Sequence, residues 1–315
     1  MVDLAPTFLR ETATGLLADA AEAGGLREWV LTGTYGMRLG LPGEIILEGI
    51  SSNDFFPYLL FDYSRFAMAA KESVHLSFGT LFDKRATAWT LINRYYSSFF
   101  SAHSLLRAHG RGITWIDASE AAKLEAIGKA YIGPQFVMRR GGYSFEFDAK
   151  NGFHGELKLA QVTYGGGSHD DFWRYFAAYL ATLGSAWLAN NVPLAQQSVA
   201  RLDELRRIIL APATRGAWLS HMRNEINYQH KYGTWFPFKT PVAGGSLEKR
   251  FLKLSNAAVD LTPSVNAQPL KAFNAATYYM AALSNDFAAL LKERAGTGAT
   301  RFRSDWNRLE AALSS

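Results

Sequence analysis

Apolar residues recur at the period of an α-helix along most of this chain. The clearest stretch runs from Lys84 to His109, where a broad apolar stripe contains Trp89, Ile92, Tyr96, Phe99, Phe100, His103 and Leu106. The same periodicity predicts further helices at about 12–31, 117–130, 168–187, 196–210, 214–232, 247–258 and 269–293. Asp117 and Glu120 have the spacing of a capping pair at the start of one of these helices. The pattern therefore predicts a mainly α protein built as a helical bundle.

The period changes to that of a strand between about residues 140 and 165. Tyr143, Phe145 and Phe147 alternate with polar residues, and Leu157 and Leu159 alternate in the same way. Because the Asn-Gly pair at 151–152 favours a two-residue turn, the two segments are expected to form a β-hairpin inserted between helices. Shorter apolar segments at 44–50 and 58–63 predict strands nearer the N-terminus, while 73–81 fits either a strand or a helix.

These patterns divide the chain into three parts. Residues 1–80 are expected to form a small α/β N-terminal extension, residues 81–295 a helical domain that carries the hairpin at about 140–165, and residues 296–315 a C-terminal helix. No internal repeat or low-complexity tract interrupts this order. With 315 residues, of which 48% are hydrophobic, the chain is long enough to bury a full core.

Composition limits the chemistry that is open to this chain. The absence of cysteine excludes disulfides, thiolate metal sites and a cysteine nucleophile. No cluster of His, Asp and Glu has the spacing of a metal site, so neither a metal nor another cofactor is expected. The net charge of +5 suits an anionic partner such as RNA. Without a membrane-spanning apolar run or a secretory pattern, the chain is expected to be cytoplasmic.

One segment, Arg223 to Tyr232, concentrates residues that can act on a phosphodiester. If it is helical, Trp218, Met222 and Ile226 form a buried stripe, and Arg223 and His230 share a polar face about 10 Å apart along the axis. Such long side chains can meet around one phosphate. An Arg–His spacing of this kind also occurs by chance, so it is the predicted helical context that favours this pair.

Cleavage of RNA without a metal requires proton transfer and a positive charge at the phosphate. His230 can transfer a proton near neutral pH, and Arg223 can grip the non-bridging oxygens in a bidentate manner. Asn224 is a candidate substrate or dimer contact, and Tyr232 a candidate donor to phosphate. The alternative is that these residues have structural roles. Arg223 then pairs with a neighbouring side chain, His230 donates to a carbonyl at the helix end, and Tyr232 packs under Trp235. His103 is expected in the core and His221 at the surface.

Two parts of the sequence resemble the HEPN superfamily. The segment from Ala88 to Leu106, with the pairs Tyr95-Tyr96 and Phe99-Phe100 before Leu105-Leu106, is similar to the opening helix of HEPN domains. Arg223, followed by His230 and Tyr232, resembles the Arg-x(4–6)-His element of that superfamily and the tyrosine that follows it in some of its toxins. Both matches occur in the expected order along the chain.

The resemblance implies a helical bundle that forms a two-fold dimer, with both copies of Arg223 and His230 facing a basic cleft. Active HEPN proteins are metal-independent ribonucleases, often toxins or anti-phage defence effectors, and the expected products are 2′,3′-cyclic phosphate and 5′-hydroxyl ends. Tyr232 corresponds to a tyrosine that is nucleotidylated in some family toxins, so an antitoxin or nucleotidyltransferase partner is a further expectation. One alternative is a non-catalytic HEPN-like module that binds nucleotides, RNA or a protein. Another is an antitoxin or partner subunit whose basic surface binds a nucleotidyltransferase-like protein.

Overall fold

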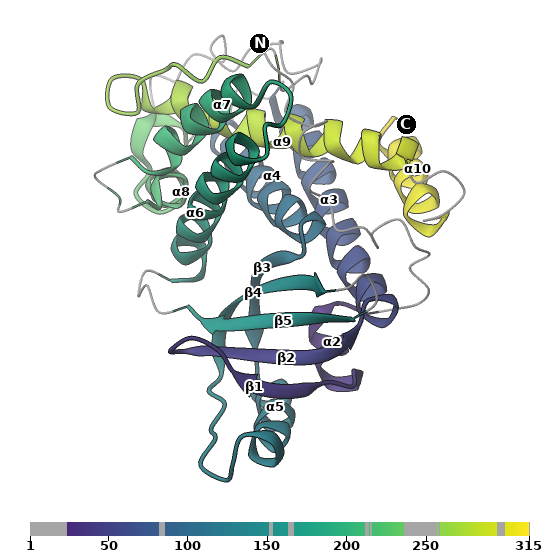
Figure 1. The fold of residues 1–315 in the computed structure, drawn as a ribbon. Helices are drawn as coiled ribbons and strands as arrows, with labels where there is room; N and C mark the ends of the chain where they lie inside the picture. The colour runs from purple at the N-terminus through teal and green to yellow at the C-terminus, as the bar shows by residue number, and fades with distance from the viewer. Residues whose placement is uncertain are drawn as a thin grey trace.

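The computed structural model describes residues 24–81, 86–150, 154–162, 167–211, 214, 216–235, 257, 259–294 and 300–314. Over these ranges the protein is mainly helical, with a helical bundle above a five-stranded antiparallel sheet (Figure 1). The mainly α fold class is confirmed. None of the described helices combines the length and apolar composition needed to cross a bilayer.

The helical bundle surrounds α4 (Thr87–Ala108), the helix with the clearest sequence pattern. Against it lie α3 (Ser52–Leu81), α8 (Trp218–Asn227) and α9 (Pro269–Arg294), while α6 (Ser168–Ala189) and α7 (Ala195–Ile209) pack together at one side (Figure 1). The shared core is rich in large rings, among them Tyr63, Tyr95, Trp173, Phe176, Trp187, Tyr279 and Phe287. The predicted C-terminal helix is present as α10 (Thr300–Ser314), which packs against α3.

The sheet joins strands from distant parts of the sequence in the order β1-β2-β5-β4-β3. Its strands are β1 (Gly36–Leu39), β2 (Glu44–Ser51), β3 (Arg111–Ile116), β4 (Gly141–Lys150) and β5 (His154–Gln161). The predicted hairpin is confirmed as β4 and β5, with Phe145 opposite Leu159 and Phe147 opposite Leu157. Its Asn-Gly turn lies outside the described residues. Because β2 also pairs with β5, the hairpin and the N-terminal extension form one sheet.

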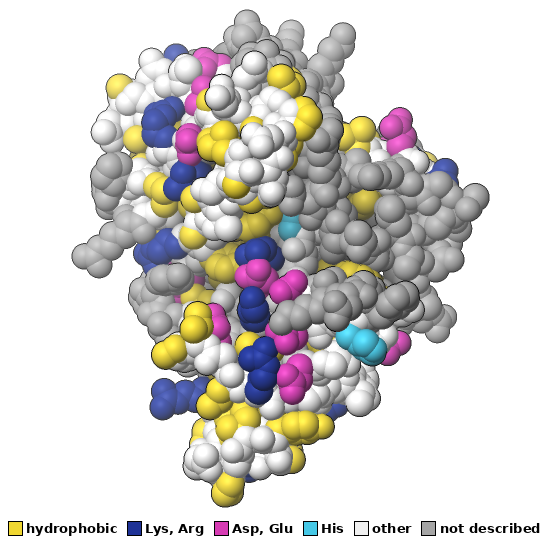
Figure 2. All heavy atoms as spheres, in the orientation of Figure 1, with side chains coloured by type: hydrophobic (Ala, Val, Ile, Leu, Met, Phe, Trp, Pro, Cys, Tyr) yellow, Lys and Arg dark blue, Asp and Glu magenta, His cyan; other side chains and the backbone are white. Residues whose placement is uncertain are grey.

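The sheet has one apolar and one polar face. Its apolar face packs against α2 (Leu26–Thr32), α5 (Ala118–Tyr131) and the start of α3, where Phe147 stacks on Phe55 at 4.5 Å between ring centroids. The polar side chains of the strands form ion pairs, including Arg38 with Glu48 and Arg111 with Glu146. Basic and acidic side chains are interleaved over the sheet (Figure 2), so the net charge is not gathered there into one basic surface.

Some sequence predictions need correction. Residues 58–63 lie within α3 and not in a strand, and 73–81 continue the same helix. Leu59, Leu60 and Tyr63 are buried at helical spacing, which a short apolar run does not distinguish from a buried strand. The short strands β1 and β3 were not predicted. The predicted helix at 247–258, apart from residue 257, and residues 12–23 lie outside the described ranges.

A buried ion pair connects the bundle to the sheet. Arg107 of α4 is 2% exposed, and its Nε lies 3.3 Å from Oδ2 of Asp62 on α3. The same guanidinium donates to the carbonyl oxygen of Ile113 on β3 at 2.9 Å and lies over the ring of Phe145 on β4. Burial lowers the pKa of Arg107, and the charge of Asp62 opposes that shift. One charged group thus contacts both layers of the molecule.

Removal of the Asp62 carboxylate should destabilise the whole protein. The change Asp62→Ala leaves the Arg107 guanidinium buried without its counter-ion, so the free energy of unfolding should fall by about 3–5 kcal/mol, as measured by urea denaturation. The matched control is Asp203→Ala, which removes an exposed i,i+3 pair with Arg206 and should change stability little. Equal effects of the two changes would contradict the structural role of the buried pair.

Candidate functional site

The motif helix is shorter than the sequence predicts. The expected helix at 214–232 is observed as α8 over Trp218–Asn227, with Tyr228 at its C-cap. His230 and Tyr232 then adopt left-handed backbone conformations, with φ of 52° and 66°, which end the helical path. Trp218, Met222 and Ile226 are buried as predicted. His230 therefore does not continue the helical face that carries Arg223.

Arg223 lies in an aromatic environment between α8 and α4. Its side chain is 9% exposed, and its guanidinium carbon lies 5.3 Å from the ring centroid of Tyr95 and 5.9 Å from that of Tyr228. Within the described ranges no carboxylate forms an ion pair with Arg223, and its Nε has no hydrogen-bond partner. A buried cation without a counter-ion is energetically unfavourable, so this position favours an anionic ligand.

The Tyr95 hydroxyl connects this environment to α6. It lies 2.9 Å from Nδ1 of His169, and it accepts a hydrogen bond from Nε1 of Trp173 at 3.2 Å. Burial raises the pKa of Tyr95 to about 12, although Trp173, Arg223 and Ser220 oppose the shift, so the phenol stays protonated at neutral pH. Burial and then the positive charge of Arg223 lower the pKa of His169. An arginine, a phenol and an imidazole are thus neighbours within one chain.

His230 lies in a different environment. Its side chain is exposed, and its ring lies 5.3 Å from that of Trp235, at an angle of 40°. Over the described residues no hydrogen bond, ion pair or ring contact joins His230 to Arg223. The single chain therefore does not bring the two predicted catalytic side chains together. The charge of Arg223 acts on a different imidazole, that of His169, whose pKa is lowered by burial and then by this charge.

Glu225 organises the turn that follows α8. Its buried carboxylate accepts hydrogen bonds from the Tyr232 hydroxyl and from Lys231, and lies 3.2 Å from Nε2 of His221. Burial opposes its ionisation, but the bonds from Lys231 and Tyr232 outweigh that effect and lower its pKa. Burial and the bond to Glu225 raise the pKa of Tyr232. Glu225 is therefore occupied by this turn and does not neutralise Arg223.

The remaining predicted residues have simpler surroundings. Asn224 is half-buried, and its backbone oxygen accepts bonds from the amides of Tyr228 and Gln229 at the end of α8. His221 is exposed, as predicted. His103 is in the core, as predicted, with its ring stacked 3.9 Å from that of Phe172, and burial lowers its pKa well below the usual range.

Sequence reasoning did not single out His169 or Glu225 as members of this site. His169 precedes Arg223 by more than fifty residues and lies at the start of a different predicted helix, 168–187. The Tyr95 side of the site does have a sequence signal, because this residue belongs to the tyrosine pair in the segment that resembles HEPN proteins. Only the packing of α4, α6 and α8 brings the three side chains together.

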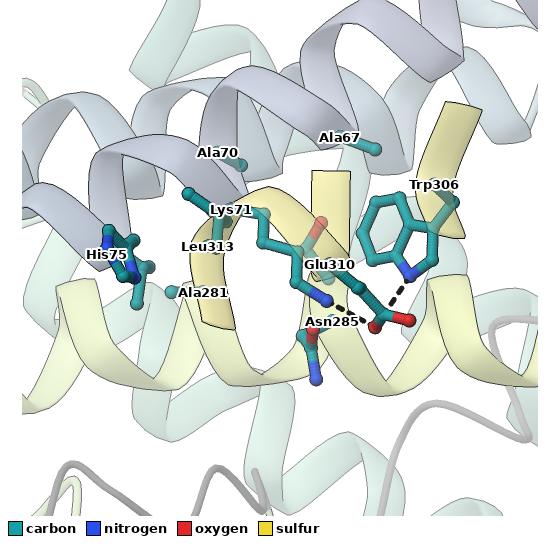
Figure 3. A pocket seen from close by; sticks show the side chains of 11 residues that line it. Ala67, Ala70, Lys71, His75, Ala281, Asn285, Trp306, Glu310 and Leu313 are labelled. Atoms are coloured by element: carbon teal, nitrogen blue, oxygen red, sulfur yellow. Dashed lines mark hydrogen bonds and ion pairs between the residues drawn. The ribbon is translucent and has the colours of Figure 1, made fainter. Parts of the chain in front are cut away.

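A separate cavity of about 390 Å³ lies between α3, α9 and α10 (Figure 3), and no residue of α8 lines it. Lys71 contacts the Trp306 ring at 4.4 Å and pairs with Glu310 at 2.5 Å, and the Glu310 carboxylate also accepts from Nε1 of Trp306. Lys292 lies 3.5 Å from the same carboxylate. Both lysines pair with the Glu310 carboxylate, so the cations at this cavity have a counter-ion, which Arg223 lacks among the described residues.

No group of three or more potential metal ligands occurs among the described side chains. Comparisons with protein families, curated proteins and solved structures found no match to this chain.

The Tyr232 hydroxyl should stabilise the turn through Glu225. The change Tyr232→Phe should lower the free energy of unfolding by about 1 kcal/mol at pH 7. Because the pKa of Glu225 is lowered in the folded protein, this difference should be fully present above the pKa of a free glutamate and should shrink as the pH falls through the folded value. Denaturation curves of both proteins between pH 7 and pH 3 measure it. A difference that grows on acidification would contradict this account.

Proposed function

We propose that this protein is a metal-independent endoribonuclease of the HEPN type, in which Arg223 binds the scissile phosphate. The observation that carries the proposal is the buried guanidinium of Arg223, which has no carboxylate partner among the described residues and an unpartnered Nε. A phosphate can supply the missing negative charge, and a guanidinium binds two of its oxygens at once. The net charge of +5 also favours an RNA partner.

The conformation of His230 supports a functional role for this residue. Left-handed backbone at a non-glycine residue is unfavourable, and such strain is often found at functional sites. Its imidazole is exposed at the surface, where it can reach a substrate or a second copy of the chain. In the proposed reaction His230 removes the 2′-hydroxyl proton, and the 2′-oxygen attacks phosphorus and expels the 5′-oxygen. The second His230 of a homodimer protonates that oxygen, which leaves 2′,3′-cyclic phosphate and 5′-hydroxyl ends.

The biological setting belongs to the same proposal. A cytoplasmic toxin or anti-phage defence nuclease requires control, and Tyr232 is the candidate for nucleotidylation by an antitoxin or nucleotidyltransferase partner. Its hydroxyl is bound to Glu225 and half-buried, so the turn must open before such a partner can modify it. Asn224, next to Arg223, remains a candidate substrate contact at the end of α8.

A second candidate function is a non-catalytic module that binds RNA, nucleotides or a protein partner. The separate surroundings of Arg223 and His230 within one chain favour it. In such a module Arg223 still binds an anion, but no proton transfer follows. The two functions therefore predict similar RNA binding and differ in cleavage.

Cleavage assays on total RNA test the proposal. Arg223→Ala should reduce the rate by at least about 100-fold because a transition-state charge loses its partner, and His230→Ala should reduce it by about 100–10,000-fold. A chelator such as EDTA should have no effect, and mapping of the cut ends should show cyclic phosphates.

The matched control is His154→Ala, an exposed histidine on β5 that should retain full activity. Circular dichroism checks that each variant is folded. Wild-type protein that binds RNA but does not cleave it would favour the binding module, and wild-type protein that does neither would refute both functions.

A further inference from the structure

We propose that His169 is a second RNA-binding side chain, whose Nε2–H donates to the phosphate that Arg223 holds. This inference rests on the proposed function and extends the site from α8 to α6. It concerns binding and orientation of the phosphodiester anion, and it involves no covalent step by His169.

The first support is the arrangement of side chains around Tyr95. The Arg223 guanidinium carbon lies 5.3 Å from the centroid of the Tyr95 ring, and the His169 ring lies 5.7 Å from the same centroid. Phe99, one turn further along α4, contacts the His169 ring at 4.5 Å. His169, at the start of α6, thus packs against α4 and shares the contact with Tyr95 with the cation that lacks a counter-ion.

The hydrogen bonds of Tyr95 favour one of the two neutral forms of the His169 imidazole. The Trp173 indole can only donate, so the Tyr95 oxygen accepts from it and keeps its own hydrogen available. When the phenol donates that hydrogen to Nδ1 of His169, at 2.9 Å, the proton of the neutral imidazole lies on Nε2. Nε2 is on the side of the ring away from Nδ1, and it has no hydrogen-bond partner among the described residues. In this form of His169, the Nε2–H group is a donor without a partner among the described residues.

The electrostatic surroundings agree with this assignment. The groups that act on His169 are Arg223 of α8, whose charge lowers its pKa together with burial, and Asp170 of its own helix, which opposes them. A neutral imidazole, protonated on Nε2, is therefore favoured at neutral pH. The second acidic residue of the first turn, Asp171, lies 3.2 Å from Arg174 and is neutralised by it.

The position of His169 in its helix also favours the binding of an anion. His169 is the second residue of α6, a helix of 22 residues, so it lies where unpaired backbone N–H groups and the helix dipole attract an anion. By itself a helix start does not define a site. Here the helix start carries His169, which bonds to Tyr95, and the ring of Tyr95 also contacts Arg223, whose buried Nε has no hydrogen-bond partner. The two features point to one phosphate position that the two helices share.

Binding of a short RNA with 2′-O-methyl groups tests the inference without cleavage, because the attacking hydroxyl is blocked. His169→Ala should weaken the affinity about tenfold through loss of one hydrogen bond to a charged group. His169→Gln places an amide N–H near the former Nε2 and should recover most of the affinity. His154→Ala is the matched control, because His154 is exposed on β5 and should bind as wild type.

The Tyr95 hydroxyl contacts His169 and its ring faces Arg223, so Tyr95 is a positioning residue, and Tyr95→Phe, which keeps the ring, tests the contact with His169. Tyr95→Phe should weaken binding several-fold in the wild-type background and should have no further effect in His169→Ala. In nitrogen-15 NMR spectra, the Nε2 resonance of His169 should shift when the 2′-O-methyl RNA is added to wild-type protein.

The outcomes separate this inference from the proposed function. If Arg223→Ala abolishes binding while His169→Ala binds as wild type, the inference is wrong and the function of Arg223 stands. If His169→Gln is as weak as His169→Ala, the donor role is also refuted. If wild-type protein does not bind the RNA at all, the proposed function fails together with the inference.

Discussion

The packing of α8 against α4 is the constraint on which the proposed site depends. It buries the Arg223 guanidinium over the Tyr95 ring, while the nearest acidic residue of its own helix, Glu225, is occupied by Lys231 and Tyr232. The fold therefore contains a cation that its own described carboxylates do not neutralise. Because a charge in such surroundings is unfavourable until an anion pairs with it, the same contact that builds the bundle also favours a phosphate ligand.

Another buried arginine, Arg107 on α4, shows the opposite arrangement. Arg107 has Asp62 as its counter-ion and carbonyl oxygens of β3 as acceptors, so its hydrogen-bonding capacity is used within the protein. Arg107 connects the bundle to the sheet, whereas Arg223 keeps an unpartnered Nε. The comparison indicates that burial alone does not make an arginine a ligand-binding residue. What differs is whether the protein itself supplies the negative charge.

Local patterns in the sequence predicted much of the fold. The helical period of α4, the capping pair of Asp117 and Glu120, and the alternation in β4 and β5 depend on near neighbours, and all three are present in the structure. The predicted stripe of α4 is only partly its buried face, because Trp89 is exposed and the helix is buried on several sides. The pairing of β2 with β5 and the meeting of Tyr95, His169 and Arg223 depend on contacts between distant segments, which periodicity does not encode. The helix α8 ends earlier than the sequence predicts, because the residue types at His230 and Tyr232 do not indicate a left-handed backbone.

The central claim is that Arg223 holds an RNA phosphate. The most direct measurement is a crystal structure of the protein with a 2′-O-methyl dinucleotide that it cannot cleave. The account predicts that non-bridging phosphate oxygens lie about 2.7–2.9 Å from the Arg223 guanidinium nitrogens, at the distance of a charge-assisted hydrogen bond. A bound dinucleotide whose phosphate lies elsewhere, with Arg223 still packed on Tyr95 and without an anion, would contradict it.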